Sequence, residues 1–536
     1  LLALLARVHR PEQVLAITFT RKAASEMTLR VMEKLDQARE NSPVTAEHER
    51  QTRELALAVI DHAAHKQWRL DDTTLNIRTI DSFCHELTRQ MPILSGTGGL
   101  VEPVDNAQPL YEEAVRQFLA QAGEGAVGER IYQLLEHFDN RWSRASELLV
   151  ALLQRRGDWA GVVSQHNDSE AAEAALSETI INLSSSRLRD ALHRLEGHLG
   201  ALMPAINKAR AHLDMTPLSL SDNPESLPDW HAMIGMLLTA KSEWRKPTGV
   251  NAKLGFPPKS DQKIQVSSIL ETLDSDSLLL AALTEIRHLP ATARGADAWQ
   301  LVVLISSLLP VLQAHLLLVF QRSGQVDHAH VALAAIQALG TDEMPTALAQ
   351  RLDYQIEHIL IDEFQDTSSS QARLLERLMR GWPENNATGA PPRTLFMVGD
   401  AMQSIYGFRY ADVTLFLRAR QGQFAGLALE SVTLTQNFRS RPEVVAWVND
   451  AFADLMGTED APHYGRVSHV KAISLLSHEP SAEAGVHIRL LEDSDGHGEA
   501  QFIAKQVANI VAQDGDASIS ILVRAKGHAD GVALAL

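Results

Sequence analysis

The chain is long, acidic and of ordinary composition for a globular protein. Its 536 residues exceed what a single hydrophobic core supports, so several domains are expected. Hydrophobic residues make up 45% and charged residues 22%, and a single cysteine excludes an intramolecular disulfide. The formal net charge of −18 excludes binding of nucleic acid by whole-molecule attraction, so any such binding requires a local basic or aromatic groove.

Two strand–helix units open the chain. The apolar run QVLAITFT (13–20) is typical of a strand buried on both faces. The residues after it predict a helix capped by Thr20, with apolar side chains at helical spacing: Ala24, Met27, Val31 and Leu35. TLNIRTI (74–80) is a second strand candidate, and another helix follows it. This alternation predicts a parallel α/β sheet.

A long helical segment then interrupts the alternation. From about Gly96 to Asp353 the sequence is rich in Leu and Ala, with turn-rich breaks at 216–230 and 245–261. Polar residues and Pro310 interrupt its longest apolar run, 301–320. These interruptions favour a buried helix or helix pair over a membrane span.

Strand-like segments resume after the helical region, at 358–363, 394–400, 431–436, 486–492 and 519–525. The pattern predicts an α/β core that is split by a large helical insertion and followed by the start of a second α/β domain. We expect the divisions to fall at residues 1–95, 96–350, 351–430 and 431–536.

Polar segments follow several of these strands, and open α/β sheets place ligand sites at the carboxyl ends of their strands. In IDEFQD, Asp362 is suited to hold Mg²⁺ and Glu363 to orient or deprotonate a water molecule. Taken alone, the acidic pair is explained equally well as the cap of the following helix.

Aromatic residues and arginines follow two later strands. VGDAMQSIYGFRYAD (398–412) brings together side chains suited to stacking on single-stranded nucleic acid, unless they are core residues of a helix start: Gln403, Tyr406, Phe408 and Arg409. LTQNFRSRPEVV (434–445) places Arg439 and Arg441 where an arginine can reach a γ-phosphate. The alternative is a solvated arginine pair before a helix that begins at Pro442.

Five segments, in this order, resemble motifs Ia, Ic, II, III and IV of the superfamily-one helicases of the UvrD/Rep type: TFTRKAASEM, TIDSFC, HILIDEFQDTSSSQ, VGDAMQSIYGFRYAD and LTQNFRSRPEVV. The long helical insertion between the second and third makes the chain most similar to the exonuclease V beta-chain (RecB) and AddA group. The resemblance implies a RecA-like P-loop NTPase core and the start of a second RecA-like domain.

The resemblance also implies an activity. It implies an ATP- and Mg²⁺-dependent DNA helicase or translocase that moves 3′ to 5′ on single-stranded DNA. Such a protein acts on DNA ends in recombination and double-strand-break repair, in the cytoplasm and without a membrane. The group further implies partner subunits and an exonuclease activity of the helicase–nuclease complex.

Residue roles are implied in the same way. Asp362 would hold Mg²⁺, Glu363 would be the general base, and Gln403 would sense the γ-phosphate. Arg439 would contact the γ-phosphate, and Phe438 would pack on the adenine. The residues that contact single-stranded DNA would be Thr18, Phe19, Thr20, Tyr406, Phe408 and Arg409.

The sequence departs from the family pattern at three places. Asp81 stands where many members carry His, and Tyr410 stands where Gly is common. No G-x-x-x-x-G-K-[ST] phosphate loop occurs in the sequence, although the family places it shortly before motif Ia. We therefore expect an internal piece of a longer helicase that hydrolyses ATP poorly by itself.

Three other interpretations compete with a helicase. The intact site residues disfavour a non-catalytic DNA-binding relative. The segments QSIYGFR and QNFRSRPE disfavour a superfamily-two helicase, because that group has other sequences after its acidic motif. A zinc module around VDHAHVAL would use His328 and His330, but no cysteine or second ligand pair lies near. Two solvated histidines at a helix start explain that segment better.

Overall fold

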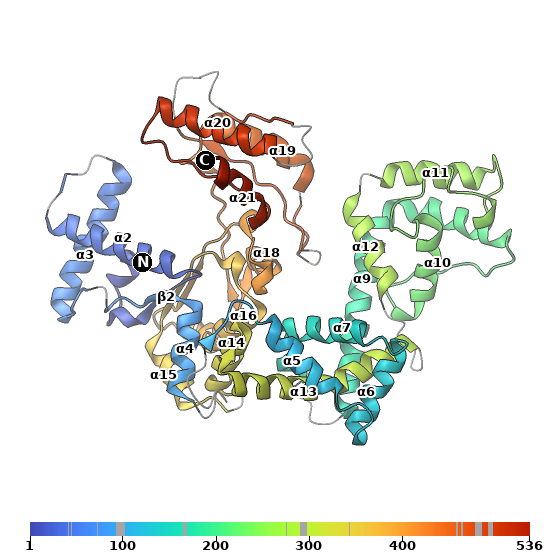
Figure 1. The fold of residues 1–536 in the computed structure, drawn as a ribbon, viewed down its shortest axis with the longest axis horizontal. Coiled ribbons are helices and arrows are strands. Elements are labelled where there is room, and N and C mark those ends of the chain that lie inside the picture. Colours follow the sequence, from blue (N-terminus) through green and yellow to red (C-terminus); the bar gives the residue numbers. More distant parts are fainter. Residues whose placement is uncertain are drawn as a thin grey trace. The chain divides into compact units, whose positions relative to one another are not determined.

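The structure is a computed structural model and describes residues 1–40, 42–43, 46–71, 73–92, 102–163, 169–274, 276–289, 297–341, 344–456, 459–462, 465–476, 485–490 and 497–536. The chain forms two compact units (Figure 1). The first comprises Leu1–Val432 and Glu459–Ser468, and the second comprises Thr433–Thr458 and His469–Leu536.

A parallel sheet organises the first unit. Its four strands are β1 (Val14–Thr18), β2 (Ile77–Thr79), β5 (His358–Ile361) and β6 (Thr394–Met397), in the order β2-β1-β5-β6. Every residue of β1 is buried, as expected for a central parallel strand. The predicted α/β class is confirmed, and each strand lies within its predicted segment. The segments that follow these strands all meet at one edge of the sheet.

Helices and short turns complete this part of the unit. The helices before the insertion are α1 (Leu2–Leu5), α2 (Arg21–Arg39), α3 (Glu47–Lys66) and α4 (Ile80–Gln90). After β5 come α16 (Ser369–Leu378), α17 (Trp382–Ala387), α18 (Val413–Arg420) and the hairpin strands β7 (Gln423–Phe424) and β8 (Leu427–Ala428). The predicted cap of α2 is confirmed, because the Thr20 hydroxyl accepts a hydrogen bond from the Ala23 amide at 3.1 Å.

The insertion is helical, as predicted, and has two apolar cores. Its helices are α5 (Gln108–Leu119), α6 (Gly125–His137), α7 (Trp142–Gln154), α8 (Arg156–Val163), α9 (Ser169–Ala211), α10 (Leu227–Leu237), α11 (Asp261–Leu273), α12 (Ser277–His288), α13 (Asp297–Ser323), α14 (His328–Leu339) and α15 (Ala347–Gln355). Helices α5, α7, α13 and α14 share the core of the sheet. Helices α9 to α12, the green group in Figure 1, enclose a core of their own around Trp230 and Phe256.

Helix α13 contains the long apolar run. By length and composition alone, Gln300–Ser323 is the one helix in the described ranges that could cross a membrane. Its Leu308, Leu312, Leu316 and Phe320 are buried in the main core, and the helix packs against α5 and α6. One side of α13 therefore belongs to the core, but only 28% of its most apolar window is buried and Leu317 and Leu318 are exposed, so the predicted burial is confirmed only in part.

A buried ion pair joins the start of α8 to the start of α14. Both carboxylate oxygens of Asp327 accept hydrogen bonds from Arg156, and one also accepts a bond from the Tyr111 hydroxyl. Burial alone would raise the pKa of Asp327, but the Arg156 guanidinium holds it below its usual value. Asp327 also caps α14, and it follows β4 (Gln325–Val326), which pairs in parallel with β3 (Glu102–Pro103).

The second unit contains fewer strands than predicted. It has a parallel pair, β9 (Gln436–Asn437) and β10 (Ile473–Ser474), with α19 (Pro442–Met456), α20 (His497–Gln513) and α21 (Lys526–Ala535). The predicted strand 431–436 is reduced to its last residue, and 519–525 and the described part of 486–492 are not strands. Their apolar patterns favour extended backbone, but a strand also requires a paired neighbour, and these segments have none among the described residues.

Candidate nucleotide and strand site

The turn after β5 carries the acidic pair. The Asp362 amide donates to the Ile17 carbonyl at 2.9 Å, which continues the β1–β5 ladder up to the first carboxylate. Glu363 follows with φ +54° in the left-handed region, and a 3₁₀ turn begins at Phe364. Left-handed backbone is costly for a residue with a Cβ, by roughly 1 kcal/mol. Such strain is common where a site has to be held in one geometry.

Gln365 joins the two loops of this site. Its side chain is 1% exposed, and its Nε2 donates to Glu363 Oε2 at 2.7 Å. Its Oε1 accepts from the Asp400 amide at 3.0 Å, on the loop after β6. A Cβ on Gly399 would lie 2.5 Å from Gln365 Oε1, so a side chain at position 399 would push the Gln365 amide out of this position. The motif contains Gln365, but its partner after β6 is visible only in the structure.

The loop after β6 extends the hydrogen-bonded set to Gln403. Gln403 lies at the end of a 3₁₀ turn, and its Nε2 donates to Asp400 Oδ2 at 2.9 Å. Asp400 Oδ1 accepts from the Met402 amide at 3.0 Å. The structure therefore links Glu363 to Gln403 through Gln365 and Asp400, although the two predicted residues are 40 positions apart in the chain.

The carboxylates of this site destabilise one another. Burial, and then the charge of Glu363, raise the pKa of Asp362, and the same causes raise the pKa of Asp366 to about 6. Asp366 Oδ1 is buried and has no hydrogen-bond partner within the described chain. An added cation would relieve this repulsion.

The residues present fit Mg²⁺ held jointly with a nucleotide. Within the described residues no group of three or more His, Cys, Asp or Glu side chains forms a complete metal site. Mg²⁺ is commonly bound by one or two carboxylates together with substrate phosphates and water, and does not need a full protein cage. Asp362 would provide such a carboxylate.

An aromatic pair lies beside these loops. The rings of Phe19 and Tyr406 have centroids 4.6 Å apart with an interplanar angle of 45°, and the Arg409 guanidinium lies 6.0 Å from the Tyr406 ring. The pair brings together residues that follow β1 and β6. Thr18 is 1% exposed and donates to the Thr20 carbonyl at 3.2 Å, so its hydroxyl is turned inward. The side chain of Phe408 lies outside the described part of the chain.

A groove of about 1130 Å³ adjoins the aromatic pair. Its walls come from the turn after β1, strand β2, one side of α4 along its whole length, the end of β3, the start of α14 and the segment after β6. It is lined by arginines as well as acids, and the arginines are Arg21, Arg78, Arg89 and Arg409. Phe19 and these four guanidinium groups give the groove the kind of aromatic and basic lining that an acidic protein needs to bind single-stranded nucleic acid.

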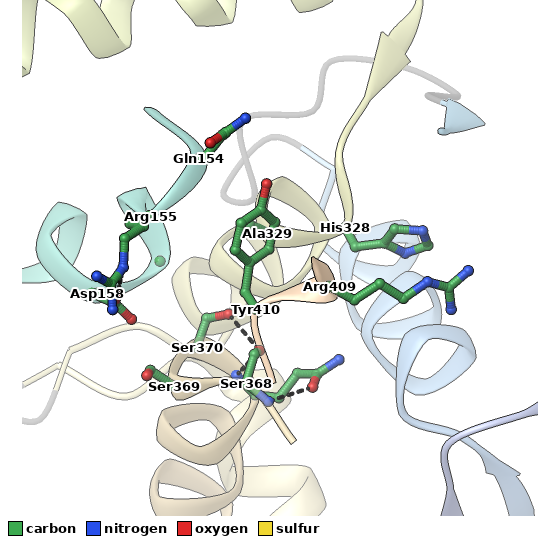
Figure 2. Close-up of a pocket in the computed structure, with 12 residues that line it drawn as sticks. Gln154, Arg155, Asp158, His328, Ala329, Ser368, Ser369, Ser370, Arg409 and Tyr410 are labelled. Carbon is green, nitrogen blue, oxygen red and sulfur yellow. Dashed lines mark hydrogen bonds and ion pairs between the residues drawn. The ribbon is translucent and has the colours of Figure 1, made fainter. Parts of the chain in front are cut away.

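Tyr410, which departs from the family pattern, lines a small pocket at the start of α16. This pocket of about 30 Å³ is lined by Tyr410, Arg409, Asp158 and the Ser368–Ser370 segment (Figure 2). It has room for about one water molecule. Tyr410 has φ +66°, a conformation that glycine adopts without strain, and burial raises the pKa of its phenol. The Tyr410 side chain is therefore partly buried within the first unit, next to Tyr111.

The interpretation of two solvated histidines is wrong, although α14 does begin at His328. His328 lies between two carboxylates, 3.1 Å from Asp81 and 3.3 Å from Asp105. Burial lowers the pKa of His330 to about 4, and its ring packs on Phe320 with centroids 5.3 Å apart. The two imidazoles therefore contact different residues. Among the described residues, neither belongs to a group of side chains that could hold a metal ion.

The remaining predicted residues belong to the second unit. The Phe438 ring is 66% exposed, and the Arg439 amide donates to Asn437 Oδ1 at 2.9 Å. Both residues follow β9, just as the predicted nucleotide-site residues of the first unit follow its own strands.

Comparison with known proteins identifies the family. Residues 1–423 match the model of the UvrD/REP helicase N-terminal domain. The chain belongs to the UvrD/REP helicase family. The match spans the whole sheet, the insertion and both loops of the carboxylate site, so the predicted resemblance is confirmed.

Curated relatives within this family share one name, which describes each of them as the same subunit of an ATP-dependent helicase/nuclease. The relative from Desulfitobacterium hafniense (strain DSM 10664 / DCB-2) is 27% identical over 84% of this chain and 33% of its own length. That from Lactococcus lactis is 25% identical over 95% and 43%, and that from Geobacillus kaustophilus is 26% identical over 83% and 36%. The chain thus spans between a third and under a half of these relatives.

Proposed function

We propose that this chain carries the hydrolytic carboxylates of an ATP-dependent DNA helicase. We also propose that the groove beside Phe19 binds part of the single-stranded DNA, and we call it the strand groove. In this proposal the protein moves 3′ to 5′ along single-stranded DNA and acts on DNA ends in recombination and double-strand-break repair in the cytoplasm. Its relatives are named as subunits, which supports a partner subunit in a helicase–nuclease complex.

The observation that carries the proposal is the hydrogen-bonded set from Glu363 to Gln403. Asp362 would hold Mg²⁺, which supplies charge neutralisation to the ATP phosphates. Glu363 would accept the proton of the attacking water at its carboxylate, and Gln365 fixes that carboxylate by its 2.7 Å bond. Gln403 would register the γ-phosphate, and any movement of Gln403 would act on Asp400 through their 2.9 Å bond.

The other predicted residues complete two binding surfaces. In the second unit, Phe438 would stack on adenine and Arg439 would contact the γ-phosphate. In the first unit, Phe19 and Tyr406 would stack on bases, and Arg409 would bind a backbone phosphate. Thr18, Thr20 and Phe408 would support the same strand, with the Thr20 hydroxyl already engaged as the cap of α2.

The test is Glu363→Gln in the complete gene product. Loss of a general base should lower ATP turnover by roughly 10²–10⁴-fold, with nucleotide and single-stranded DNA binding retained. Glu384→Gln, at an exposed position on α17, is the matched control and should keep wild-type turnover. Wild-type turnover in Glu363→Gln would remove this residue from the role of base. A wild-type protein that binds DNA without hydrolysing ATP would establish the non-catalytic alternative.

A further inference from the structure

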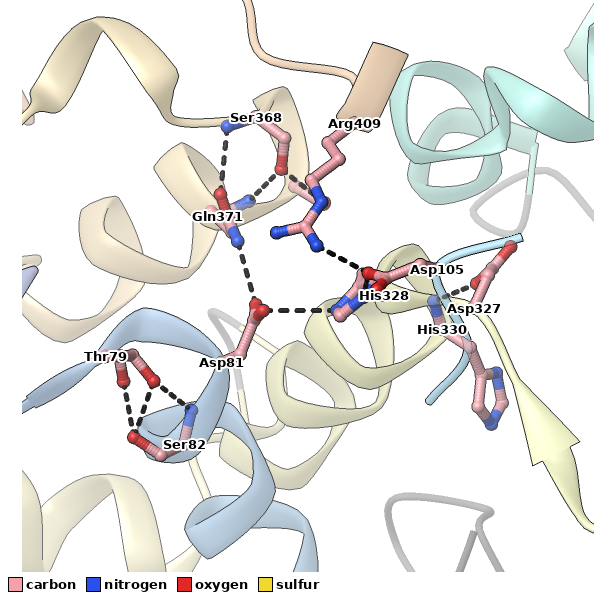
Figure 3. Close-up of polar contacts among 11 residues, drawn as sticks. Thr79, Asp81, Ser82, Asp105, Asp327, His328, His330, Ser368, Gln371 and Arg409 are labelled. Carbon is pink, nitrogen blue, oxygen red and sulfur yellow. Dashed lines mark hydrogen bonds and ion pairs between the residues drawn. The ribbon is translucent and has the colours of Figure 1, made fainter. Parts of the chain in front are cut away.

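The strand groove contains an ion pair that its proposed function does not require. Arg409 Nη2 lies 2.5 Å from Asp105 Oδ1, and the Asp105 side chain is 74% exposed (Figure 3). Asp105 belongs to the helical insertion, whereas Arg409 follows β6 in the segment with Tyr406. Both side chains line the groove. The guanidinium that would bind a DNA phosphate is therefore already occupied by an anion of the chain itself.

The fold holds Asp105 in this place from two sides. Asp105 follows β3 by two residues and His328 follows β4 by two residues, so the parallel pairing of these strands brings the two side chains together. His328 Nε2 lies 3.3 Å from the same Asp105 oxygen that Arg409 contacts. Hydrogen bonding to Asp81, and then to Asp105, raises the pKa of His328.

Asp81 is in turn fixed to the helix after the acidic motif. Gln371 Nε2 donates to Asp81 Oδ1 at 3.2 Å, and Gln371 Oε1 accepts from the Ser368 amide at 3.0 Å (Figure 3). The departure from the family pattern at position 81 therefore has a structural use, because an aspartate there anchors His328.

We propose that Asp105 is a carboxylate latch that occupies the phosphate-binding position of Arg409 and is displaced when single-stranded DNA enters the groove. The inference rests on the proposed strand groove. A carboxylate and a phosphodiester present similar oxygen acceptors to a guanidinium, so they compete for it. The pair is solvent-exposed and weak enough to exchange. His328 keeps a partner for Asp105 after Arg409 has turned to the phosphate.

The competing explanation is that Asp105 only orients Arg409 for DNA. The two explanations predict opposite signs, because removal of a competitor tightens DNA binding and removal of an orienting partner weakens it. General electrostatics is a third possibility, since loss of any negative charge in the groove favours a polyanion. Its effect would not depend on Arg409.

The experiment measures binding of a fluorescent oligothymidylate of roughly 20 nucleotides to the chain by anisotropy at low salt. Asp105→Asn should lower Kd about three- to fivefold, the fold-change that corresponds to a surface ion pair. In an Arg409→Gln background the same substitution should change Kd less than about 1.5-fold. Asp105→Glu, which keeps the carboxylate, should stay near wild type.

Asp222→Asn is the matched control, because Asp222 pairs with Arg189 on the surface of the insertion and does not line the groove. It should leave Kd unchanged. Weaker or unaltered binding by Asp105→Asn overturns the latch, and so does an equal gain in the Arg409→Gln background. If the wild-type chain binds the strand and Asp105→Asn changes nothing, only the latch fails. If neither binds, the latch and the DNA part of the proposed function fail together.

Discussion

Gln365→Met tests whether one buried amide holds the two loops of the carboxylate site together. Methionine has a similar length and no hydrogen-bonding amide, so the substitution removes the 2.7 Å bond to Glu363 and the 3.0 Å bond from the Asp400 amide. It also leaves the Asp400 amide without its partner. The first of these bonds lies within the loop after β5, and the second joins that loop to the loop after β6.

The cost follows from the kind of bond that is lost. A bond to a carboxylate contributes about 1.5–3 kcal/mol and a neutral bond about 0.5–1.5 kcal/mol, so the free energy of unfolding should fall by roughly 2–4 kcal/mol. Because Gln365 is 1% exposed, water does not replace the lost partners in the folded chain. The Glu363 carboxylate should also lose its fixed position, which should lower ATP turnover in the complete gene product.

Two measurements check this prediction. Urea unfolding of the chain reports the free energy, and hydrogen exchange of the Asp400–Gln403 amides reports the loop locally. Gln355→Met, at an exposed position near the end of α15, is the control and should change stability by less than about 0.5 kcal/mol. A Gln365→Met variant as stable as this control, with unaltered exchange after β6, would refute the proposed bridge.

Two further predictions concern buried charges. The fold raises the pKa of Asp366 to about 6, so the ionised carboxylate destabilises the folded chain. Asp366→Asn should therefore stabilise the chain by up to ~3 kcal/mol above pH 6, and this gain should disappear as the pH falls towards about 4. A gain that persists at pH 4 in thermal unfolding would contradict the assignment. Asp327→Asn should cost about 3–5 kcal/mol in urea unfolding because it leaves the Arg156 guanidinium buried without its counter-ion, whereas Asp222→Asn at an exposed pair should cost less than about 1 kcal/mol. Equal costs at the two sites would show that burial does not govern these pairs.

The sequence was sufficient for the sheet of the first unit because the determinants there are local. Central parallel strands appear in the sequence as apolar runs, and Thr20 is a typical N-cap residue at the start of the helix that follows one of them. The acidic pair and the aromatic residues were found for the same reason, since each sits at the end of such a run. In the second unit the strand predictions at 519–525 and at the described part of 486–492 were wrong, because pairing depends on a neighbour that a local pattern does not specify.

Contacts between distant segments could not be predicted from the sequence. The bond from Gln365 to Asp400 joins loops 35 residues apart, and the contact of Asp105 with Arg409 spans 304 residues. No periodicity or spacing encodes such pairs. The sequence predicted a solvated His328 because no cysteine or second ligand pair lies near it in the chain. Its actual partners, Asp81 and Asp105, are brought to it by α4 and by the β3–β4 pair.

The most direct test of the proposed motor is the rate of ATP hydrolysis by the complete gene product with and without oligothymidylate. If the carboxylate site and the strand groove act as one machine, single-stranded DNA should stimulate hydrolysis. Tyr406→Ala should then shift the half-maximal DNA concentration upward by roughly 5- to 150-fold, as expected for loss of one stacked base. Hydrolysis that is indifferent to DNA, or stimulation that Tyr406→Ala leaves untouched, would contradict the proposal.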